Sequence, residues 1–181
     1  MVSPDSSRTR FAVDPMALLK REHRMILDRL VMVETAMSDP STRTDGVKRT
    51  NRETLRELLT FFTGPVDVHF KREAMLVDHL RKTSEGKQEE EQYQSFLEEH
   101  RALKADAMAV KRRLARKQDR EQDTAAATGS GGLRALTAEL QALIARYREQ
   151  IACEERLLFA LAEMRLTAEH RRRIGRRMLQ V

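Results

Sequence analysis

The 181-residue sequence contains no tryptophan, one cysteine, four prolines and seven glycines. Few turn-forming and aromatic residues disfavour a chain of short strands and fit long helices. The single Cys153 cannot form an internal disulfide, so we expect a reducing, cytoplasmic environment. No apolar run approaches the roughly 20 residues of a membrane span, and residues 1–10 lack the apolar core of a secretory signal. The sequence therefore argues against a disulfide-stabilised domain and a membrane-spanning protein.

Positive charge is concentrated near the C-terminus. The net charge is +6, but residues 165–181 carry six arginines against one glutamate, a balance of +5 that leaves +1 for the preceding chain. Such a segment can contact nucleic acid or acidic lipid, although cations also suit the C-terminal end of a helix. We interpret residues 166–181 as a solvated basic helix and expect neither membrane nor nucleic acid as a partner. A basic interaction helix is the alternative.

Apolar residues at steps of three and four predict four long helices. The first begins at Asp14-Pro15, an N-cap followed by proline at the first helical position. The second covers residues 48–82, and Gly64-Pro65 predicts a kink or short break within it. The third and fourth cover residues 88–118 and 133–164, joined by a low-complexity linker from Gln118 to Gly132.

These elements predict an all-α protein, an antiparallel up-down four-helix bundle with a short C-terminal helix. The length favours a single domain. We expect a disordered N-terminal segment at 1–13, the bundle at 14–165 and the basic C-terminal helix at 166–181, capped by Thr167.

Polar residues interrupt the apolar stripe of every predicted helix about midway along it: His23, His69 with Glu73, His100, and Glu154. A bare buried carboxylate costs several kcal/mol unless it is paired, protonated or bound to metal. His69 and Glu73 are four residues apart, so both reach the same side of their helix. Bound cations would offset the burial and the mutual repulsion of the two glutamates, and imidazole with carboxylate suits iron. The pattern predicts a metal centre inside the bundle. His79 and His170 fall off these stripes and are predicted to be exposed.

Four segments resemble the bacterial hemerythrin-like, or HHE cation-binding, family. Leu19-Lys-Arg-Glu-His23-Arg-Met-Ile26 is similar to its first-helix histidine segment, and His69-Phe70-Lys-Arg-Glu73 to its His-Phe-x-x-Glu signature. Phe96-Leu97-Glu-Glu-His100 resembles its Leu-x-x-His element, and Gln150-Ile151-Ala-Cys-Glu154-Glu155-Arg-Leu-Leu158-Phe159 its His-Ile-x-x-Glu-Glu-x-x-Leu-Phe element. The resemblance covers residues 15–165 and implies a hemerythrin-like bundle.

The resemblance also implies a carboxylate-bridged, non-heme di-iron site. Glu73 and Glu154 would bridge the metals, His23 and His69 would bind one iron, and His100 would bind the other. It implies oxygen binding, or reaction with dioxygen, peroxide or nitric oxide, under oxidative or nitrosative stress. Peroxidase-like or catalase-like activity is our first expectation. The alternative is a non-catalytic module with one metal or a depleted site.

The chain departs from the family pattern in the fourth helix, where Gln150 replaces the histidine. A neutral amide oxygen is a weaker ligand for iron than imidazole, so the second metal position looks under-coordinated. Gln150 itself, Tyr147 one turn before it and Cys153 about one turn after it are candidate additional ligands.

Overall fold

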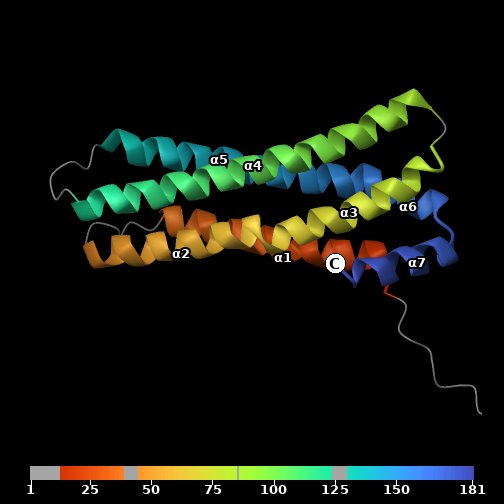
Figure 1. Ribbon diagram of the computed structural model, residues 1–181, viewed down its shortest axis with the longest axis horizontal. Coiled ribbons are helices and arrows are strands. Elements are labelled where there is room, and N and C mark those ends of the chain that lie inside the picture. Colours follow the sequence, from red (N-terminus) through yellow and green to blue (C-terminus); the bar gives the residue numbers. More distant parts are fainter. Residues whose placement is uncertain (1–12, 39–44, 85, 124–129) are drawn as a thin grey trace, which may run out of the picture.

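A computed structural model describes residues 13–38, 45–84, 86–123 and 130–181, and over these residues the chain is an all-α bundle of four antiparallel rods (Figure 1). This confirms the predicted fold class. The rods, in chain order, are α1 (Pro15–Ser38); α2 (Asp45–Thr63) with α3 (Pro65–Arg81); α4 (Lys87–Asp123); and α5 (Ser130–Cys153) with the π-helical turn η2 (Glu154–Leu158) and α6 (Phe159–Arg165). A last helix, α7 (Ala168–Met178), folds back beside α1 and α3.

The helix ends follow the predicted local signals. Asp14 Oδ2 accepts a hydrogen bond from the Ala17 backbone N–H at 3.2 Å, which caps α1. Gly64 separates α2 from α3, and proline occupies the first turn of α3, as expected for the predicted break. Thr167 Oγ1 accepts from the His170 backbone N–H at 3.2 Å and caps α7.

The predicted linker from Gln118 to Gly132 is too long. Residues 118–123 continue α4 and residues 130–132 begin α5, while 124–129 lie outside the described residues. Four of the six residues in this extension of α4 are Gln, Arg or Glu, which are strong helix formers, and the low-complexity pattern hid that preference. The predicted disordered segment falls almost wholly on residues 1–12, which are also outside the described residues.

The apolar core is divided into two clusters with a polar layer between them. On α1, Leu19 belongs to one cluster and Ile26 to the other, and buried His23 lies between them. On each of the other rods, the buried polar residues likewise lie between a residue of the Ile26 cluster and a residue of the Leu19 cluster. These pairs are Val66 and Leu76 on α3, Leu103 and Phe96 on α4, and Ile151 and Leu158 on the fourth rod. Each rod therefore places its buried polar residues at the same depth.

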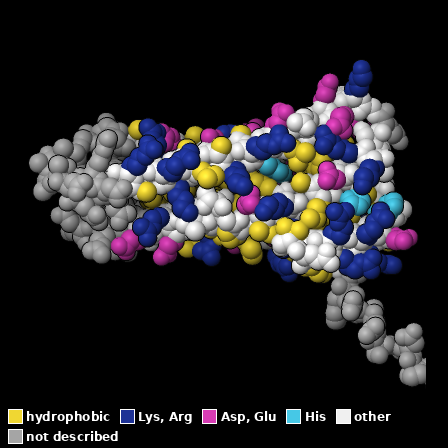
Figure 2. All heavy atoms as spheres, in the orientation of Figure 1, with side chains coloured by type: hydrophobic (Ala, Val, Ile, Leu, Met, Phe, Trp, Pro, Cys, Tyr) yellow, Lys and Arg dark blue, Asp and Glu magenta, His cyan; other side chains and the backbone are white. Residues whose placement is uncertain are grey.

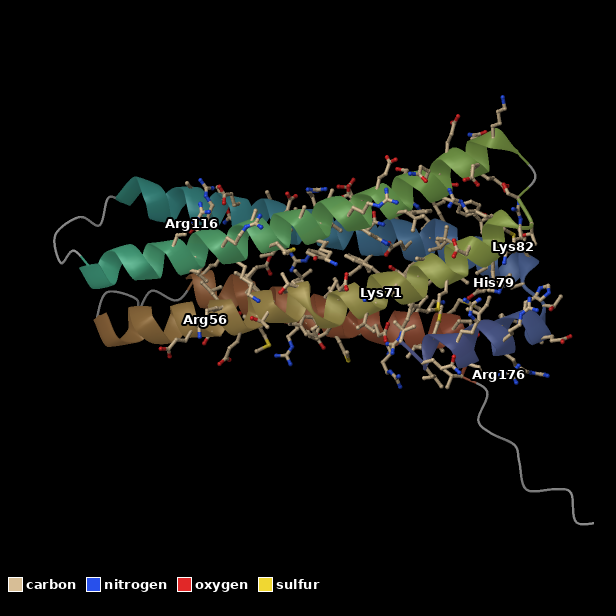
Figure 3. All side chains as sticks on the ribbon, viewed as in Figure 1. Arg56, Lys71, His79, Lys82, Arg116 and Arg176 are labelled. Carbon is tan, nitrogen blue, oxygen red and sulfur yellow. The ribbon has the colours of Figure 1, made fainter. Side chains whose placement is uncertain are left out.

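Helix α7 is packed against the bundle rather than solvated on all sides. Ile174, Gly175 and Met178 are buried. A Cβ atom on Gly175 would lie 1.9 Å from the backbone oxygen of Val13, so only glycine allows this approach of α7 to the start of α1. The five arginines of α7 lie on its remaining surface together with Glu169 and His170, and Arg176 extends outward (Figure 3).

His79 is buried, with 7% exposure, and its Nδ1 donates to the Met75 carbonyl at 2.9 Å. The prediction that it is exposed is therefore wrong, because α3 contacts α1, α4, α6 and α7 and is covered on more than one face. His170 is half-buried.

Lys and Arg side chains are spread over the face seen in Figure 2, including the end where α7 lies. Within the described residues, every helix is too short or too polar to cross a bilayer.

Candidate metal centre

Three imidazole rings present their Nε2 atoms to two carboxylates in the polar layer. His23 Nε2 lies 3.1 Å from Glu73 Oε1 and 3.4 Å from Glu154 Oε2. His69 Nε2 lies 3.3 Å from Glu73 Oε2. His100 Nε2 lies 2.6 Å from Glu154 Oε1 and 3.3 Å from Glu73 Oε2. All five side chains are buried, so four rods bring the five predicted ligands into one cluster.

The fourth rod widens where it meets this cluster. The Phe159 backbone N–H bonds to the Glu154 carbonyl five residues earlier, which is the hydrogen bond of a π-helical turn. Glu154 and the adjacent Glu155 both contact the His23 ring, at Nε2 and at Nδ1 respectively. Such turns often occur at functional sites. Sequence periodicity predicted an uninterrupted helix here.

The buried charges are strongly coupled. Burial by itself would lower the pKa of His23, but hydrogen bonds and charge from Glu154 and Glu73 outweigh it and raise that pKa to about 10. Burial likewise opposes protonation of His69, but Glu73 and Glu22 raise its pKa to about 9. Burial opposes ionisation of Glu73, yet its histidine neighbours hold the pKa of this carboxyl well below its usual range. Protons therefore supply the positive charge of the metal-free cluster.

The chemistry of the cluster fits a metal ion. Glu73 Oε2 is buried and accepts no hydrogen bond from the described residues, although two imidazole nitrogens lie 3.3 Å from it. A buried acceptor that makes no hydrogen bond is costly, and a cation would satisfy it. One ligand atom each from His23, His69, Glu73 and Glu154 lie within 4.8 Å of one another. Imidazole nitrogen with carboxylate oxygen is a donor set suited to iron.

Two further carboxylates hold the outer nitrogens of two rings. His23 Nδ1 donates to Glu155 Oε1 at 2.9 Å, and His69 Nδ1 donates to Glu22 Oε2 at 3.0 Å. Because a carboxylate only accepts, these bonds keep hydrogen on Nδ1 and direct Nε2 to the cluster. The predictions missed Glu22 and Glu155. Their only sequence signal is that each adjoins a predicted ligand, as surface charges also do.

The His100 side of the cluster is built differently. Gln150 Nε2 donates to Glu154 Oε1 at 2.5 Å, so the amide acts as a donor to a carboxylate. The His100 ring stacks on Phe70, with centroids 4.2 Å apart and planes 9° apart. Within the described residues, we find no carboxylate contact to His100 Nδ1.

The two remaining candidate ligands lie beside the cluster. Tyr147 is buried, its ring packs 5.1 Å from that of Phe62, and its hydroxyl has no hydrogen-bond partner among the described residues. Burial raises the pKa of this phenol, which disfavours phenolate without a cation nearby. Cys153 is half-buried against the apolar cluster that contains Leu158, and it is not part of the compact ligand group. Ligation by either residue stays a prediction.

A family model, the hemerythrin HHE cation-binding domain, matches residues 14–162. The matched segment contains all five converging His and Glu side chains together with Gln150, and it ends before α7. Comparisons with curated proteins and with solved structures find no match.

Proposed function

The chain belongs to the hemerythrin HHE cation-binding family, and from this premise we propose that it is a non-heme di-iron protein that binds or reacts with dioxygen, peroxide or nitric oxide. The observation that carries the proposal is the convergence of three imidazoles and two carboxylates, from four rods, in one buried layer. Apolar clusters border this layer on both sides along the bundle.

Each side chain has a role in the proposed centre. His23 and His69 would hold one iron, and His100 would hold the other. Glu73 and Glu154 would serve both positions, since each carboxylate contacts imidazoles from both sides of the layer. Bound iron would supply redox chemistry and open coordination positions for small ligands.

The presence of Gln150 favours a metal position that reacts with small molecules over one whose coordination is complete. Its amide nitrogen bonds to Glu154, so the fourth rod offers no imidazole to the His100 side. A metal position with fewer strong ligands accepts a small molecule more readily than a filled one. Peroxidase-like or catalase-like activity is therefore the activity we propose first.

The test is elemental analysis and near-ultraviolet absorption of aerobically purified protein, followed by peroxide turnover. We expect close to two irons per chain, a ligand-to-metal absorption band lost on chelation, and turnover that disappears in Glu73→Ala. A protein that binds no iron after reconstitution contradicts the proposal.

A module with a single metal is the second candidate. The compact ligand group consists of His23, His69, Glu73 and Glu154, and His100 is not part of it. Four donors satisfy one ion without help from the His100 side. One metal per chain, with no effect of His100→Ala on metal content, would favour this candidate.

A further inference from the structure

Arg72 lies next to Glu73 in sequence, but its side chain contacts α1 and α7. Its Nε donates to the backbone oxygen of Met178, near the end of α7, at 2.8 Å. Its Nη1 contacts Glu22 Oε1 on α1. The side chain is only 17% exposed. One guanidinium therefore connects α3, α1 and the C-terminal helix.

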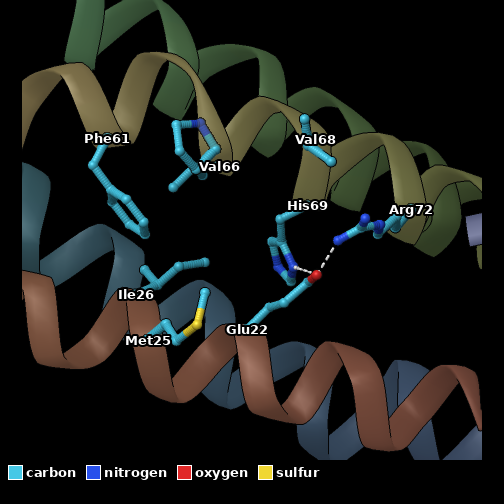
Figure 4. Close-up of a pocket in the computed structure, with 9 residues that line it drawn as sticks. Glu22, Met25, Ile26, Phe61, Val66, Val68, His69 and Arg72 are labelled. Carbon is cyan, nitrogen blue, oxygen red and sulfur yellow. Dashed lines mark hydrogen bonds and ion pairs between the residues drawn. The ribbon is translucent and has the colours of Figure 1, made fainter. Parts of the chain in front are cut away.

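The Glu22 carboxylate lies between His69 and Arg72, as Figure 4 shows, and each of its oxygens has one partner. Oε1 accepts from Arg72, and Oε2 accepts from His69 Nδ1 at 3.0 Å. The carboxylate thus sets both the tautomer and the rotation of the His69 ring. Arg72 in turn holds the carboxylate.

A pocket of about 320 Å³ lies beside the Glu22 carboxylate, so the position of that carboxylate depends on Arg72. Glu22, His69 and Arg72 form its polar wall, and the rest is mostly apolar, with these residues: Met25, Ile26, Phe61, Pro65, Val66 and Val68. The apolar side chains offer Glu22 no hydrogen-bond donor. Without the guanidinium, the carboxylate has room to turn into the pocket and be hydrated.

Helix α7 determines where the Met178 carbonyl lies. Ile174 and Met178 belong to the apolar cluster that also contains Leu19 and Leu76. The contact of Gly175 with the Val13 backbone leaves no space for a side chain. A guanidinium at the C-terminal end of a helix also has favourable electrostatics. The anchor of Arg72 therefore comes from a segment beyond residues 14–162, the part that matches the family.

We propose that Arg72 is a positioning residue for His69, acting through Glu22, and that docking of α7 holds Arg72 in place. The C-terminal helix contributes no ligand, yet it raises the metal affinity of the His69 side. This inference rests on the proposed metal-binding function. Loss of a residue that supports a ligand typically weakens metal binding by about 10–100-fold.

The experiment titrates full-length, metal-free protein with Co²⁺, and with Fe²⁺ under anaerobic conditions, in competition with a chelator. Arg72→Met should weaken binding of the metal on the His69 side, which we expect to be the tighter equivalent, by about 10–100-fold and leave the other equivalent unchanged. Arg72→Lys should recover part of the affinity, since an ammonium keeps the charge but lacks the planar fork. Gly175→Val should produce the same loss with Arg72 and Glu22 intact. If that variant does not fold, Ile174→Ala takes its place.

Arg148→Met is the matched control. Arg148 forms a two-bond pair with Glu34 of α1, both bonds at 2.7 Å, about three helical turns along α1 from His23. It should retain wild-type affinity for both equivalents. The Co²⁺ ligand-field spectrum is the second measurement, because it reports the His69 ligand directly. It should change in Arg72→Met and not in Arg148→Met.

Each outcome decides a separate point. Wild-type affinity and spectrum in Arg72→Met overturn the inference, and wild-type affinity in both α7 variants overturns the role of α7. A wild-type protein that binds neither metal overturns the proposed function and this inference together. Weakened binding in Arg72→Met with intact wild-type binding supports both.

Discussion

The two sides of the candidate metal centre receive different support from the protein. On one side, His23 and His69 each donate Nδ1–H to a carboxylate, Glu155 and Glu22, and Arg72 holds the latter. On the other side, His100 rests on the face of Phe70, and Gln150 donates its amide N–H to Glu154. The shared Glu73 and Glu154 join them.

The difference shows how one cluster can contain two unequal metal positions. A carboxylate behind an imidazole fixes the tautomer and makes the ring a stronger ligand. An aromatic ring stacked on the face of an imidazole fixes the plane of that ring, but it accepts no hydrogen bond from Nδ1–H. We therefore expect the His23 and His69 side to bind metal more tightly and the His100 side to be more open to small ligands.

Removing the shared carboxylate of Glu73 should abolish metal binding on both sides of the centre, and this is the largest effect we expect. Glu73→Ala deletes a carboxylate that contacts all three imidazoles. Both metal equivalents should be lost, a larger effect than the roughly 10–100-fold typical of a residue behind a ligand. Elemental analysis after reconstitution measures it. Glu149→Ala, at an exposed position on α5, is the control. Unchanged metal content in Glu73→Ala would refute the site assignment.

Removing one imidazole from each side in turn should show that the two sides differ in metal affinity. His69→Ala should abolish the tighter equivalent, because it removes one of the two imidazoles proposed to hold that metal. His100→Ala should reduce only the weaker equivalent. Chelator competition with both variants measures the two affinities. Equal losses in the two variants would mean that the two sides are equivalent.

Metal affinity should rise with pH, because metal must displace protons from the better-supported rings. The pKa values of His23 and His69 are raised to about 10 and about 9 in the metal-free fold. Each proton released gives up to about tenfold tighter binding per pH unit below these values. Isothermal titration in buffers of different ionisation heat counts the protons. Release of no protons at pH 7 would contradict the raised pKa values.

The same pKa shifts determine whether the stability of the metal-free protein rises or falls with pH. A histidine whose pKa is higher in the folded than in the unfolded state stabilises the fold fully below its ordinary pKa. That contribution is lost as pH rises through the folded value. The melting temperature of metal-free protein should therefore fall from about pH 6.5 to about pH 10, and bound metal should flatten this dependence. A melting temperature that rises over this interval would count against it.

The smallest effect should come from making the weaker side resemble the stronger one. Gln150→His places an imidazole where the side chain already contacts Glu154. Occupancy of the second equivalent should increase and peroxide turnover should fall as the open position fills. Tyr147→Phe and Cys153→Ser belong in the same series, since ligation by either residue would blunt the change. If occupancy, spectrum and turnover all stay the same, Gln150 does not face the second metal position.

The sequence anticipated the fold and the buried polar layer more completely than the surroundings of that layer. Helical periodicity located His23, His69, Glu73, His100 and Glu154 on buried faces, because a polar residue in an apolar stripe is visible in one chain segment alone. The same logic failed for His79, since a helix covered by several neighbours has more than one buried face. It also could not distinguish Glu22 and Glu155 from ordinary surface charges.

The sequence by itself determined the long helices, their order and most of the residues that they bury, because side-chain spacing and helix capping are local properties. Only the tertiary structure decided that Glu22 of α1 supports His69 of α3, and that Arg72 ties both to the end of α7. These partners are separated by 47 and 106 residues in the chain. Their contacts arise from how whole helices pack, and no spacing within one helix encodes them.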